Sequence, residues 1–577
     1  MKKIIVRRDI AATGDGLPAG LHPVLRRVYL SRLLRDAREL EYSLEGLHPY
    51  ADLKGISFAV DLFAAAVQQK KRILIVADFD ADGATSCAVA MRGLRLLGVR
   101  DVRYVVPNRF AFGYGLTPEI VAVAAQQQPE LLITVDNGIS SIEGVAAARA
   151  RGMRVLITDH HLPGAVLPDA DAIVNPNQPG DAFPSKNLAG VGVIFYVLLA
   201  LRARLREEQW FARAAVAEPN LAQLLDLVAL GTVADVVPLD HNNRILVSQG
   251  LARIRAGRCC AGIRALIEAA GRHPRQLIAS DLGFAVAPRL NAAGRLEDMS
   301  LGIECLLSDD DAQARMMAAR LDQLNQERRA IEAQMQEEAL AAIAALRIGE
   351  EDPGLATGVC LFQEHWHQGV IGILAARIKD RLHRPVIAFA QASDDELKGS
   401  ARSVSGVHIR DVLDAVAAHH PGLLSKFGGH AMAAGLTLSK QNFAAFSAAF
   451  DEEVRRHLAP EAMRGVVLSD GELAPSELNL GLAELLRDAG PWGQAFPEPL
   501  FDGSFEILNR RIVGERHLKL VVRTPGHDQL LDAIVFNAGE HAVARDVAQA
   551  RVVYKLDVNE YRGQRSAQLL IEHIEMI

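Results

Sequence analysis

The sequence is poor in cysteine and has no long apolar run. Its 577 residues include five cysteines, none of them in a C-x-x-C pair, so the common zinc spacing is absent and no disulfide framework is indicated. No apolar stretch approaches the length of about 18 residues that a membrane span needs, and the N-terminal stretch MKKIIVRRDI lacks the apolar core of a secretory signal. We therefore expect a cytoplasmic protein.

The chain also lacks an excess of basic charge. Its formal net charge is −7, which argues against a general nucleic-acid binder, because such proteins are usually basic. Acids clustered at one site can nevertheless hide a local basic groove in this total. Half of the residues are apolar and 23% are charged, which is ordinary for a globular protein, and the length predicts about three domains.

The region from residue 72 to residue 240 alternates short apolar segments with alanine-rich segments. The apolar segments are residues 73–77, 102–106, 131–135 and 153–157, and the alanine-rich ones are residues 87–97, 118–127 and 142–151. This βαβ pattern predicts an α/β fold with a parallel sheet that is covered on both faces. Residues 1–71 have a helical pattern and are expected to pack beside the sheet.

The rest of the chain predicts three further parts. Residues 309–350 form a long connecting helix, since apolar residues recur there at helical spacing without Pro or Gly up to residue 347; a surface helix of the first domain is the alternative. Residues 351–460 return to α/β patterning. Residues 461–577 alternate like strands, with a hairpin signal at NEYRG, and predict a small β-barrel. The first domain is then residues 1–308.

Three aspartates follow the first predicted strand. The stretch RILIVADFDADGATS contains Asp78, Asp80 and Asp82 at alternate positions, followed by Gly83. An EF-hand calcium loop begins in the same way, but it needs a bidentate Glu where this chain has Val89. The flanking segment also has the pattern of a buried strand and not of a helix. The three carboxylates therefore predict a cation site at the end of a strand.

Other predicted strands also end in possible metal ligands. The stretch LLITVD ends at Asp136, RVLITDHH ends in Asp159, His160 and His161, and ALGTVADVVPL contains Asp235. A single Asp after a strand is typical of a turn or a helix cap, but that reading does not explain the paired histidines. Oxygen ligands with an imidazole favour Mg²⁺ or Mn²⁺. Two ions are expected because so many acids around one ion would repel each other.

These motifs carry a resemblance to a known family. DFDADG, VDNG, DHH and GTVADVVPL, in this order, resemble the first four motifs of the DHH phosphoesterase superfamily. RLNAAGR, HQGVIGILAARI, SARSVSGVHIRDVL and KFGGHAMAAG are similar to the RecJ family of bacterial single-strand-specific exonucleases. The resemblance covers most of the chain.

The resemblance implies the activity and the domain types. It implies a metal-dependent 5′→3′ exonuclease that releases mononucleotides from single-stranded DNA in recombination and repair. The first domain would be the DHH catalytic domain, the second a DHHA1-like substrate-binding domain, and the barrel an OB-like nucleic-acid-binding domain. A single-strand-binding protein and a helicase are the implied partners of a monomeric enzyme.

The resemblance also implies roles for the predicted ligands. Asp80 and Asp82 would each hold one ion, Asp136 would bridge both, and His160 and Asp235 would complete the second site. His161 would touch the scissile phosphate, and Asp159 would orient the histidines. Several members of the superfamily have a histidine where this chain has Val76, and Asp78 is the candidate for the missing ligand.

Candidate DNA contacts lie in five further stretches. Arg109, within the aromatic stretch VPNRFAFGYG, is a candidate for a phosphate contact; for the aromatic residues an ordinary surface loop is as good an explanation. RLNAAGR has a loop-like setting and would line the site. The resemblance adds residues of the second α/β domain. The predicted contacts from these stretches are Arg289, Asn291, Arg295, His367, Arg402, Lys426, Gly428, Gly429 and His430.

Two other parts of the sequence have features of nucleic-acid or nucleotide binding. Basic residues of the barrel such as Lys519, Lys555 and Arg565 suit a strand-binding face, although a solvated β surface would look similar. GVGVIF at residues 190–195 resembles half of a dinucleotide fingerprint, but it lacks the third glycine and the preceding strand. We therefore do not predict a dinucleotide site.

Three rival functions are considered. A haloacid-dehalogenase-type phosphatase would need Thr where this chain has Ala84, and it leaves the two histidines unexplained. A different DHH phosphodiesterase would act on short oligonucleotides or cyclic dinucleotides, but such chains are typically shorter. A non-catalytic DHH-fold scaffold that binds DNA should have lost acids, and here every acid is present.

Overall fold

The computed structural model describes residues 3–10, 16–108, 115–345, 356–458, 465–514, 517–536, 538, 548–561 and 563–576. The chain divides into two compact units. One comprises Met1–Val6 and Gln326–Leu468, and the other comprises Arg7–Asn325 and Ser469–Ile577. No helix in these described ranges combines the length and the apolarity that crossing a membrane requires.

The larger unit contains the predicted parallel sheet. Its five strands lie in the order β3-β2-β4-β5-β6, and every neighbouring pair is parallel. The strands are β2 (Ile73–Ala77), β3 (Val102–Val105), β4 (Leu131–Val135), β5 (Arg154–Thr158) and β6 (Ala172–Val174). Four of them match the predicted apolar segments, and β6 was not predicted because it is only three residues long.

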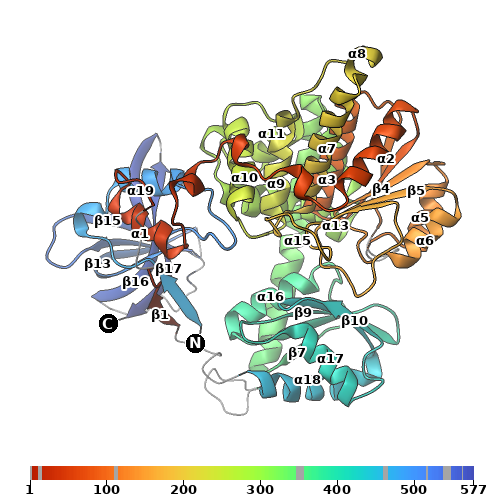
Figure 1. Ribbon diagram of the computed structural model, residues 1–577. Helices are drawn as coiled ribbons and strands as arrows, with labels where there is room; N and C mark the ends of the chain where they lie inside the picture. The colour runs from red at the N-terminus through yellow and green to blue at the C-terminus, as the bar shows by residue number, and fades with distance from the viewer. Residues whose placement is uncertain are drawn as a thin grey trace. The chain divides into compact units, whose positions relative to one another are not determined.

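Helices cover both faces of this sheet. Ile73 and Ile75 of β2 share a core with α2 (Ile56–Gln68), α3 (Ala81–Leu96) and α7 (Gly190–Glu207), whereas Leu74 and Val76 pack with α5 (Pro118–Ala125) and α6 (Ile142–Ala150) (Figure 1). Because successive side chains of a strand point to opposite faces, a strand buried on both faces must be apolar throughout. The uninterrupted apolar segments of the sequence therefore predicted these strands.

Further helices complete the larger unit. Residues 16–71 contain α1 and α2 with short 3₁₀ turns between them, as the helical pattern predicted. Ile4–Arg7, however, is a strand, β1, that pairs with β12 (Val466–Ser469), and most of both strands belongs to the smaller unit. The other described helices are α1 (Pro23–Ser31), α8 (Trp210–Ala214), α9 (Leu225–Ala234), α10 (His241–Arg255), α11 (Ala261–Ala269), α12 (Ala279–Asp281), α13 (Ala287–Leu296), α14 (Ser300–Leu307) and α19 (Leu480–Asp488).

The C-terminal strands form the predicted barrel. It is closed in the order β13-β14-β15-β17-β16. The strands are β13 (Phe501–Val513), β14 (His517–Arg523), β15 (Leu530–Val535), β16 (Gln549–Tyr561) and β17 (Gln564–Met576). The last two strands pair from Tyr561 opposite Gln564 onward, so the hairpin turns within the NEYRG stretch as the sequence indicated.

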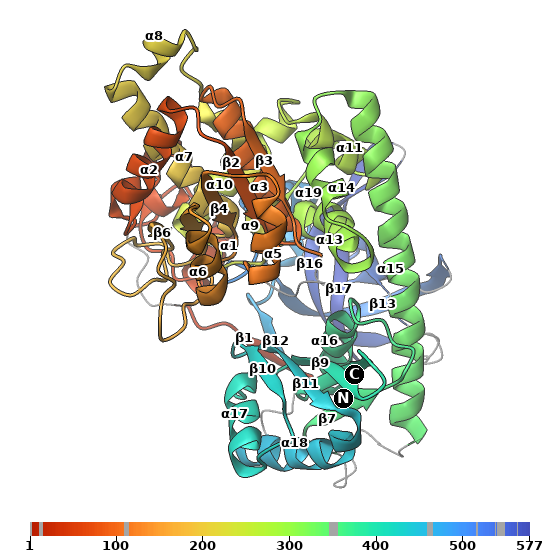
Figure 2. The same ribbon diagram turned by 90° about the vertical axis from the view of Figure 1, so that its right-hand side faces the viewer.

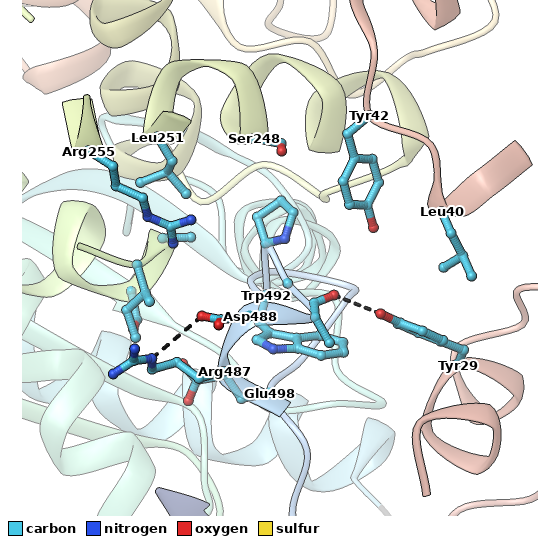
Figure 3. Close-up of a pocket in the computed structure, with 16 residues that line it drawn as sticks. Tyr29, Leu40, Tyr42, Ser248, Leu251, Arg255, Arg487, Asp488, Trp492 and Glu498 are labelled. Carbon is cyan, nitrogen blue, oxygen red and sulfur yellow. Dashed lines mark hydrogen bonds and ion pairs between the residues drawn. The ribbon is translucent and has the colours of Figure 1, made fainter. Parts of the chain in front are cut away.

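The segment that leads into the barrel packs against the N-terminal part of the same unit. The ring of Tyr29 stacks on Trp492 with centroids 6.0 Å apart, and the buried guanidinium of Arg32 pairs with Asp470. A cavity of about 290 Å³ lies beside these contacts, lined by Tyr29, Tyr42, Arg255 and Trp492 among others (Figure 3). None of the predicted metal ligands lines this cavity.

The smaller unit holds a second five-stranded sheet in the order β10-β11-β9-β8-β7. Only the β7–β8 pair is parallel. The strands are β7 (Val359–Phe362), β8 (Val386–Gln391), β9 (Glu396–Arg402), β10 (Lys426–Gly429) and β11 (Ala433–Ser439), and the helices are α16 (Ile371–Leu382), α17 (Ile409–His419) and α18 (Phe443–His457).

The predicted connecting helix is α15 (Asp311–Ala345), which is continuous over 35 residues (Figure 2). Its residues up to Asn325 belong to the larger unit and those from Gln326 belong to the smaller one. Met335, Ala339 and Ile343 are buried in one core with β7, β8 and α16. The helix therefore connects two units and is not only a surface helix of the first domain.

Candidate metal centre

The first group of acids lies where β2 passes into α3. Asp78 follows the strand directly, and its Oδ1 accepts a hydrogen bond of 2.8 Å from the N–H of Phe79. Asp80 is the N-cap of α3, and its Oδ1 accepts a hydrogen bond of 3.0 Å from the N–H of Gly83. Asp82 lies in the first turn of α3 and is 1% exposed. The strand and the helix thus deliver three carboxylates within five residues.

Asp136 stands at the end of the neighbouring strand β4. Its backbone has a φ of +62°, a conformation that is uncommon for a residue with a side chain, and it is 1% exposed. The side-chain amide of Asn137 donates hydrogen bonds of 3.1 Å and 2.9 Å to the carbonyl oxygens of Val76 and Val135. These bonds tie the end of β4 to β2 and fix the place of Asp136.

The third strand, β5, delivers Asp159, His160 and His161. The Asp159 carboxylate accepts hydrogen bonds from the backbone N–H groups of Ile139, His160 and His161, at 2.9 Å, 2.7 Å and 3.1 Å. Its Oδ1 also lies 2.8 Å from Nδ1 of His161. Asp159 is therefore surrounded by donors and orients the His161 ring.

His160 connects the acids of the three strands with α9. Its Nε2 lies 3.1 Å from Asp136 Oδ1, 3.4 Å from Asp235 Oδ2 and 3.9 Å from Asp82 Oδ2. Asp235 reaches the cluster as the C-cap of α9. The chain thus folds residues from Asp78 to Asp235 into one cluster.

The cluster contains three sets of side chains that could each hold a metal ion. They are Asp78, Asp80 and Asp136; Asp82, His160 and Asp235; and Asp136, His160 and His161, with the ligand atoms of each set within 4.8 Å of one another. Carboxylate oxygens with one or two imidazole nitrogens are donors that suit Mn²⁺ or Mg²⁺. Asp136 belongs to two of the three sets. Asp78 belongs to one of them, whereas Val76, which has no ligand atom, is buried in β2.

The electrostatics of the cluster also favour a cation. Burial, together with the neighbouring Asp80, raises the pKa of Asp82 to about 7. Burial and the other aspartates raise the pKa of Asp136 and the pKa of Asp235 well above the ordinary value. Burial would lower the pKa of His161, but the hydrogen bond to Asp159 and the negative charges of Asp159, Asp235 and Asp78 together outweigh burial and raise that pKa to about 9. Divalent cations would remove the repulsion among these carboxylates.

The RLNAAGR stretch was predicted to have a loop-like setting, and this prediction was wrong. The stretch lies in α13, which begins at Ala287 and ends at Leu296. The side-chain oxygen of Asn291 accepts a hydrogen bond of 2.9 Å from the N–H of Ala81. Arg289 is 8% exposed and pairs with Asp322 at 2.7 Å. Both side chains thus bond within the protein, and Asn291 supports the loop that carries Asp80.

Sequence reasoning missed a contribution of α7 to this cluster. The N–H groups of Gly190 and Val191, within the stretch rejected as a dinucleotide site, donate hydrogen bonds of 2.6 Å and 3.0 Å to the two carboxylate oxygens of Asp82. Two glycines in the stretch were the available signal, because glycine permits close backbone approach. The stretch was compared only with a dinucleotide-binding motif, so a bond from its backbone to a carboxylate of the same chain was not predicted.

Three candidate DNA contacts of the smaller unit, Arg402, Gly429 and His430, lie near one end of its sheet. Arg402 ends β9 opposite Ala433 of β11, and the N–H of His430 donates a 2.8 Å hydrogen bond to the carbonyl oxygen of Ala433. Gly429 has a φ of +149°, and a Cβ there would lie 2.5 Å from that same oxygen. Burial lowers the pKa of Arg402. Lys426 and Gly428 are exposed on β10.

The remaining candidates are placed as follows. Gly372, in the first turn of α16, packs against the guanidinium of Arg402, and His367 lies four residues before this helix. Arg109, with the aromatic residues of its stretch, lies outside the described residues. On the barrel, Lys519 pairs with Asp532, Lys555 with Glu498, and Arg565 with Glu484.

Comparison with known proteins begins with the domain types. Residues 72–232 match the DHH family, N-terminal domain, residues 352–456 match the DHHA1 domain, and residues 469–573 match the RecJ OB domain. These matches define the class of protein: a DHH domain that holds the acid cluster, a DHHA1 domain and an OB barrel.

Whole-chain relatives are more specific. The chain is 58% identical to the single-stranded-DNA-specific exonuclease RecJ of Dickeya dadantii, over 98% of both chains. Crystal structures of RecJ from Thermus thermophilus in complex with Mn²⁺ and with Mg²⁺ match 100% of this chain and 79% and 78% of theirs, with TM-scores of 0.80 and 0.75 and identities of 30% and 29%. The chain belongs to the RecJ family. This finding removes the rival haloacid-dehalogenase-type phosphatase.

Proposed function

We propose that this protein is a metal-dependent exonuclease that degrades single-stranded DNA from its 5′ end and releases mononucleotides. The observation that carries this function is the convergence of buried and half-buried carboxylates and imidazoles from β2, β4, β5 and α9 into sets with ligand atoms within 4.8 Å. The whole-chain relative from Dickeya dadantii is named a single-stranded-DNA-specific exonuclease, and two RecJ structures contain Mn²⁺ or Mg²⁺.

Two ions fit the donor sets of the cluster. The first ion is held by Asp78, Asp80 and Asp136, and the second by Asp82, His160 and Asp235, with Asp136 shared between them. The grouping of these side chains supports the assignment. A pair of divalent cations supplies a nucleophile at neutral pH and neutralises the charge that develops on the phosphate during cleavage. The chain's own part is to hold the pair in place from three strands and a helix end.

His161 acts on the scissile phosphate. Its side chain is the partly exposed imidazole of the cluster, with 32% of the side chain accessible. The Asp159 hydrogen bond to Nδ1 leaves Nε2 as the atom that faces the substrate and stabilises its charge or donates a proton. Asp159 is then a positioning residue, because its carboxylate oxygens are occupied by donors of the protein.

The DNA strand is gripped by basic groups and by exposed backbone. Arg109 contacts the terminal or scissile phosphate, and Arg289, Asn291 and Arg295 line the site. In the smaller unit, Arg402, Lys426, His430 and His367 contact the strand, and the backbone at Gly428 and Gly429 approaches a phosphate closely. The position of Arg402, Gly429 and His430 at one end of the sheet supports this grip.

The cellular setting follows from the family resemblance. The enzyme acts as a cytoplasmic monomer in DNA recombination and repair, and a single-strand-binding protein and a helicase supply or present its substrate. Cross-linking of the purified protein to each of these two partners would test this part of the proposal.

Digestion of end-labelled oligonucleotides tests the activity. With Mn²⁺, a 5′-labelled single strand should lose its label at once as mononucleotide, whereas a 3′ label should persist in shrinking fragments. Duplex with blunt ends should resist, and EDTA should stop all cleavage. Loss of the 3′ label first would contradict the polarity. Cleavage of only short oligonucleotides or cyclic dinucleotides, or no cleavage at all, would contradict the exonuclease.

Asp136→Ala tests the metal assignment directly. The change removes the carboxylate shared by both ions, so nucleotide release should be abolished while single-strand affinity, measured by fluorescence anisotropy in EDTA, is retained. Asp169→Ala is the matched control, because Asp169 is an exposed aspartate of the same domain. Retained cleavage by the Asp136 variant would refute the shared role.

A further inference from the structure

The first turn of α7 contacts the acid cluster. The first four N–H groups of a helix have no partner within the helix, and Ala189, the N-cap of α7, supplies no side-chain bond. Two of these N–H groups, those of Gly190 and Val191, instead donate to Asp82 Oδ2 at 2.6 Å and to Asp82 Oδ1 at 3.0 Å. Each oxygen of the Asp82 carboxylate is therefore held by a backbone amide.

The same turn also packs against Asp136. A Cβ atom on Gly190 would lie 2.5 Å from Cβ and 2.5 Å from Oδ1 of Asp136. Real Cβ atoms do not approach other heavy atoms so closely, so only glycine fits while Asp136 keeps its place. Asp136 cannot easily retreat, because its backbone is in the left-handed region and its neighbour Asn137 is bonded to two strands.

The contact constrains the carboxylates without blocking them. A carboxylate oxygen has two lone pairs, so an oxygen that accepts one amide N–H can still bind a cation. The helix start thus holds a candidate metal ligand by both of its oxygens.

We propose that Gly190 is a positioning residue that presets Asp82 and Asp136 for the metal ions before the ions bind. The proposal rests on the proposed function only in that the cluster binds divalent cations. It assigns a role to the GVGVIF stretch that is different from nucleotide binding: the stretch binds a carboxylate of its own chain.

Gly190→Ala and Gly192→Ala form a matched pair for the test. Both changes add one methyl group to the same helix, but a Cβ on Gly192 would meet Leu188 Cδ2 at 3.0 Å, the end of a flexible side chain. Mn²⁺ affinity is measured on the full chain by titration with electron paramagnetic resonance detection of free Mn²⁺. We expect Gly190→Ala to weaken Mn²⁺ binding about 10- to 100-fold, as loss of an orienting contact does at metal sites, and Gly192→Ala to leave it unchanged.

The melting temperature of the metal-free protein separates positioning from a general loss of structure. It should be similar for the two variants, whereas the rise on adding a given concentration of Mn²⁺ should be smaller only in Gly190→Ala. Wild-type Mn²⁺ affinity in the Gly190 variant would overturn the proposal. Because the readout is Mn²⁺ binding, a wild-type protein that binds Mn²⁺ but cleaves no DNA would refute the proposed function and leave this inference standing.

Hydrogen exchange of the wild-type protein gives a second test that does not depend on the variant's folding. If the carboxylate is held before the ions bind, the amides of Gly190 and Val191 should exchange slowly in EDTA, unlike the first amides of an uncapped helix. Residue-resolved mass spectrometry measures this rate. Fast exchange of both amides in the metal-free protein would overturn the proposal.

Discussion

At the scale of single residues, Asp159 shows how a carboxylate next to the cluster differs from a ligand. Its Oδ1 accepts from the N–H groups of His160 and His161 and lies 2.8 Å from Nδ1 of His161, and its Oδ2 accepts from the N–H of Ile139. Such a set of donors leaves little capacity for a metal ion. It lowers the pKa of Asp159 in spite of burial.

The substitution Asp159→Asn should disturb the orientation of the His161 ring and leave the metal ligands in place. The amide group must point its NH₂ at one or more buried N–H donors, which leaves donors unsatisfied at a cost of about 1–3 kcal/mol each. We expect single-turnover cleavage to slow by about 10- to 100-fold and single-strand affinity to stay the same. Time courses with radiolabelled oligomers measure the rate of single-turnover cleavage, and fluorescence anisotropy measures the single-strand affinity.

Asp169→Asn is the control for this prediction, since the Asp169 side chain is 93% exposed. It should leave both quantities at the wild-type level. A fully active Asp159→Asn variant would show that His161 needs no orientation by its neighbour.

At the scale of secondary-structure elements, α13 is bonded to the loop between β2 and α3 and packs against it. Asn291 accepts the N–H of Ala81, and Gly294 packs against the carbonyl oxygen of Phe79. These contacts fix the backbone on both sides of Asp80. A helix remote in sequence therefore determines where the first acids of the cluster stand.

Asn291→Ala should loosen this loop. Removing the acceptor leaves the N–H of Ala81 without its partner, so the free energy of unfolding should fall by about 1 kcal/mol, and Mn²⁺ affinity should fall with it. Denaturant melts and Mn²⁺ titration measure the two effects. Asn291→Asp keeps an acceptor oxygen at the same place and should retain Mn²⁺ binding.

The opposite result would favour the alternative role of Asn291 as a DNA contact. In that case Asn291→Ala would weaken single-strand binding in EDTA and leave the Mn²⁺ affinity unchanged. The pair of measurements thus distinguishes a supporting residue from a DNA-binding one.

At the scale of the whole molecule, the barrel and the catalytic sheet belong to the same compact unit. The segment from Ser469 to Asp502 is bound to the N-terminal part of the chain through Arg7, Arg32 and Tyr29. Deleting residues 469–577 would remove the partners of Arg32 and Tyr29, which are both buried. Substitutions on the barrel surface are therefore a better test of DNA binding than truncation.

Asp502 gives this unit an acid-sensitive contact. Burial alone would raise the pKa of Asp502, but hydrogen bonds from Arg7, Arg551 and Ser469 outweigh it and lower that pKa to about 2. An aspartate in the unfolded chain titrates near pH 3.9. Because the folded pKa is the lower one, the contribution of about 2 kcal/mol is present above pH 4 and is lost as the pH falls toward 2.

Asp502→Asn should therefore lower the free energy of unfolding at neutral pH and flatten its decline between pH 4 and pH 2. Urea melts at several pH values measure the free energy of unfolding of the wild type and of the variant, and so give the slope of its decline with pH for each protein. An unchanged slope in the variant would mean that Asp502 does not contribute to acid unfolding. Glu472, which is largely exposed beside Arg7, provides the control Glu472→Gln, for which little change is expected.

Sequence patterns alone were enough to predict the parallel sheet, the long helix, the barrel and most of the acid cluster. Strand periodicity is local, and parallel strands bring their carboxyl ends to one edge, so Asp78, Asp136 and Asp159 could be placed together without a structure. Asp235 and the role of Asp78 beside Val76 came from the family resemblance and from the acids' positions along the chain.

The backbone groups that hold those acids could not be identified without the folded structure. The amides of Gly190 and Val191 lie more than a hundred residues from Asp82 in the chain, and Asn291 lies 210 residues from Ala81. Such contacts leave no periodic signal, because they depend on how helices from distant parts of the chain pack on the sheet. Local patterns specify elements, whereas close approach between elements is set by packing.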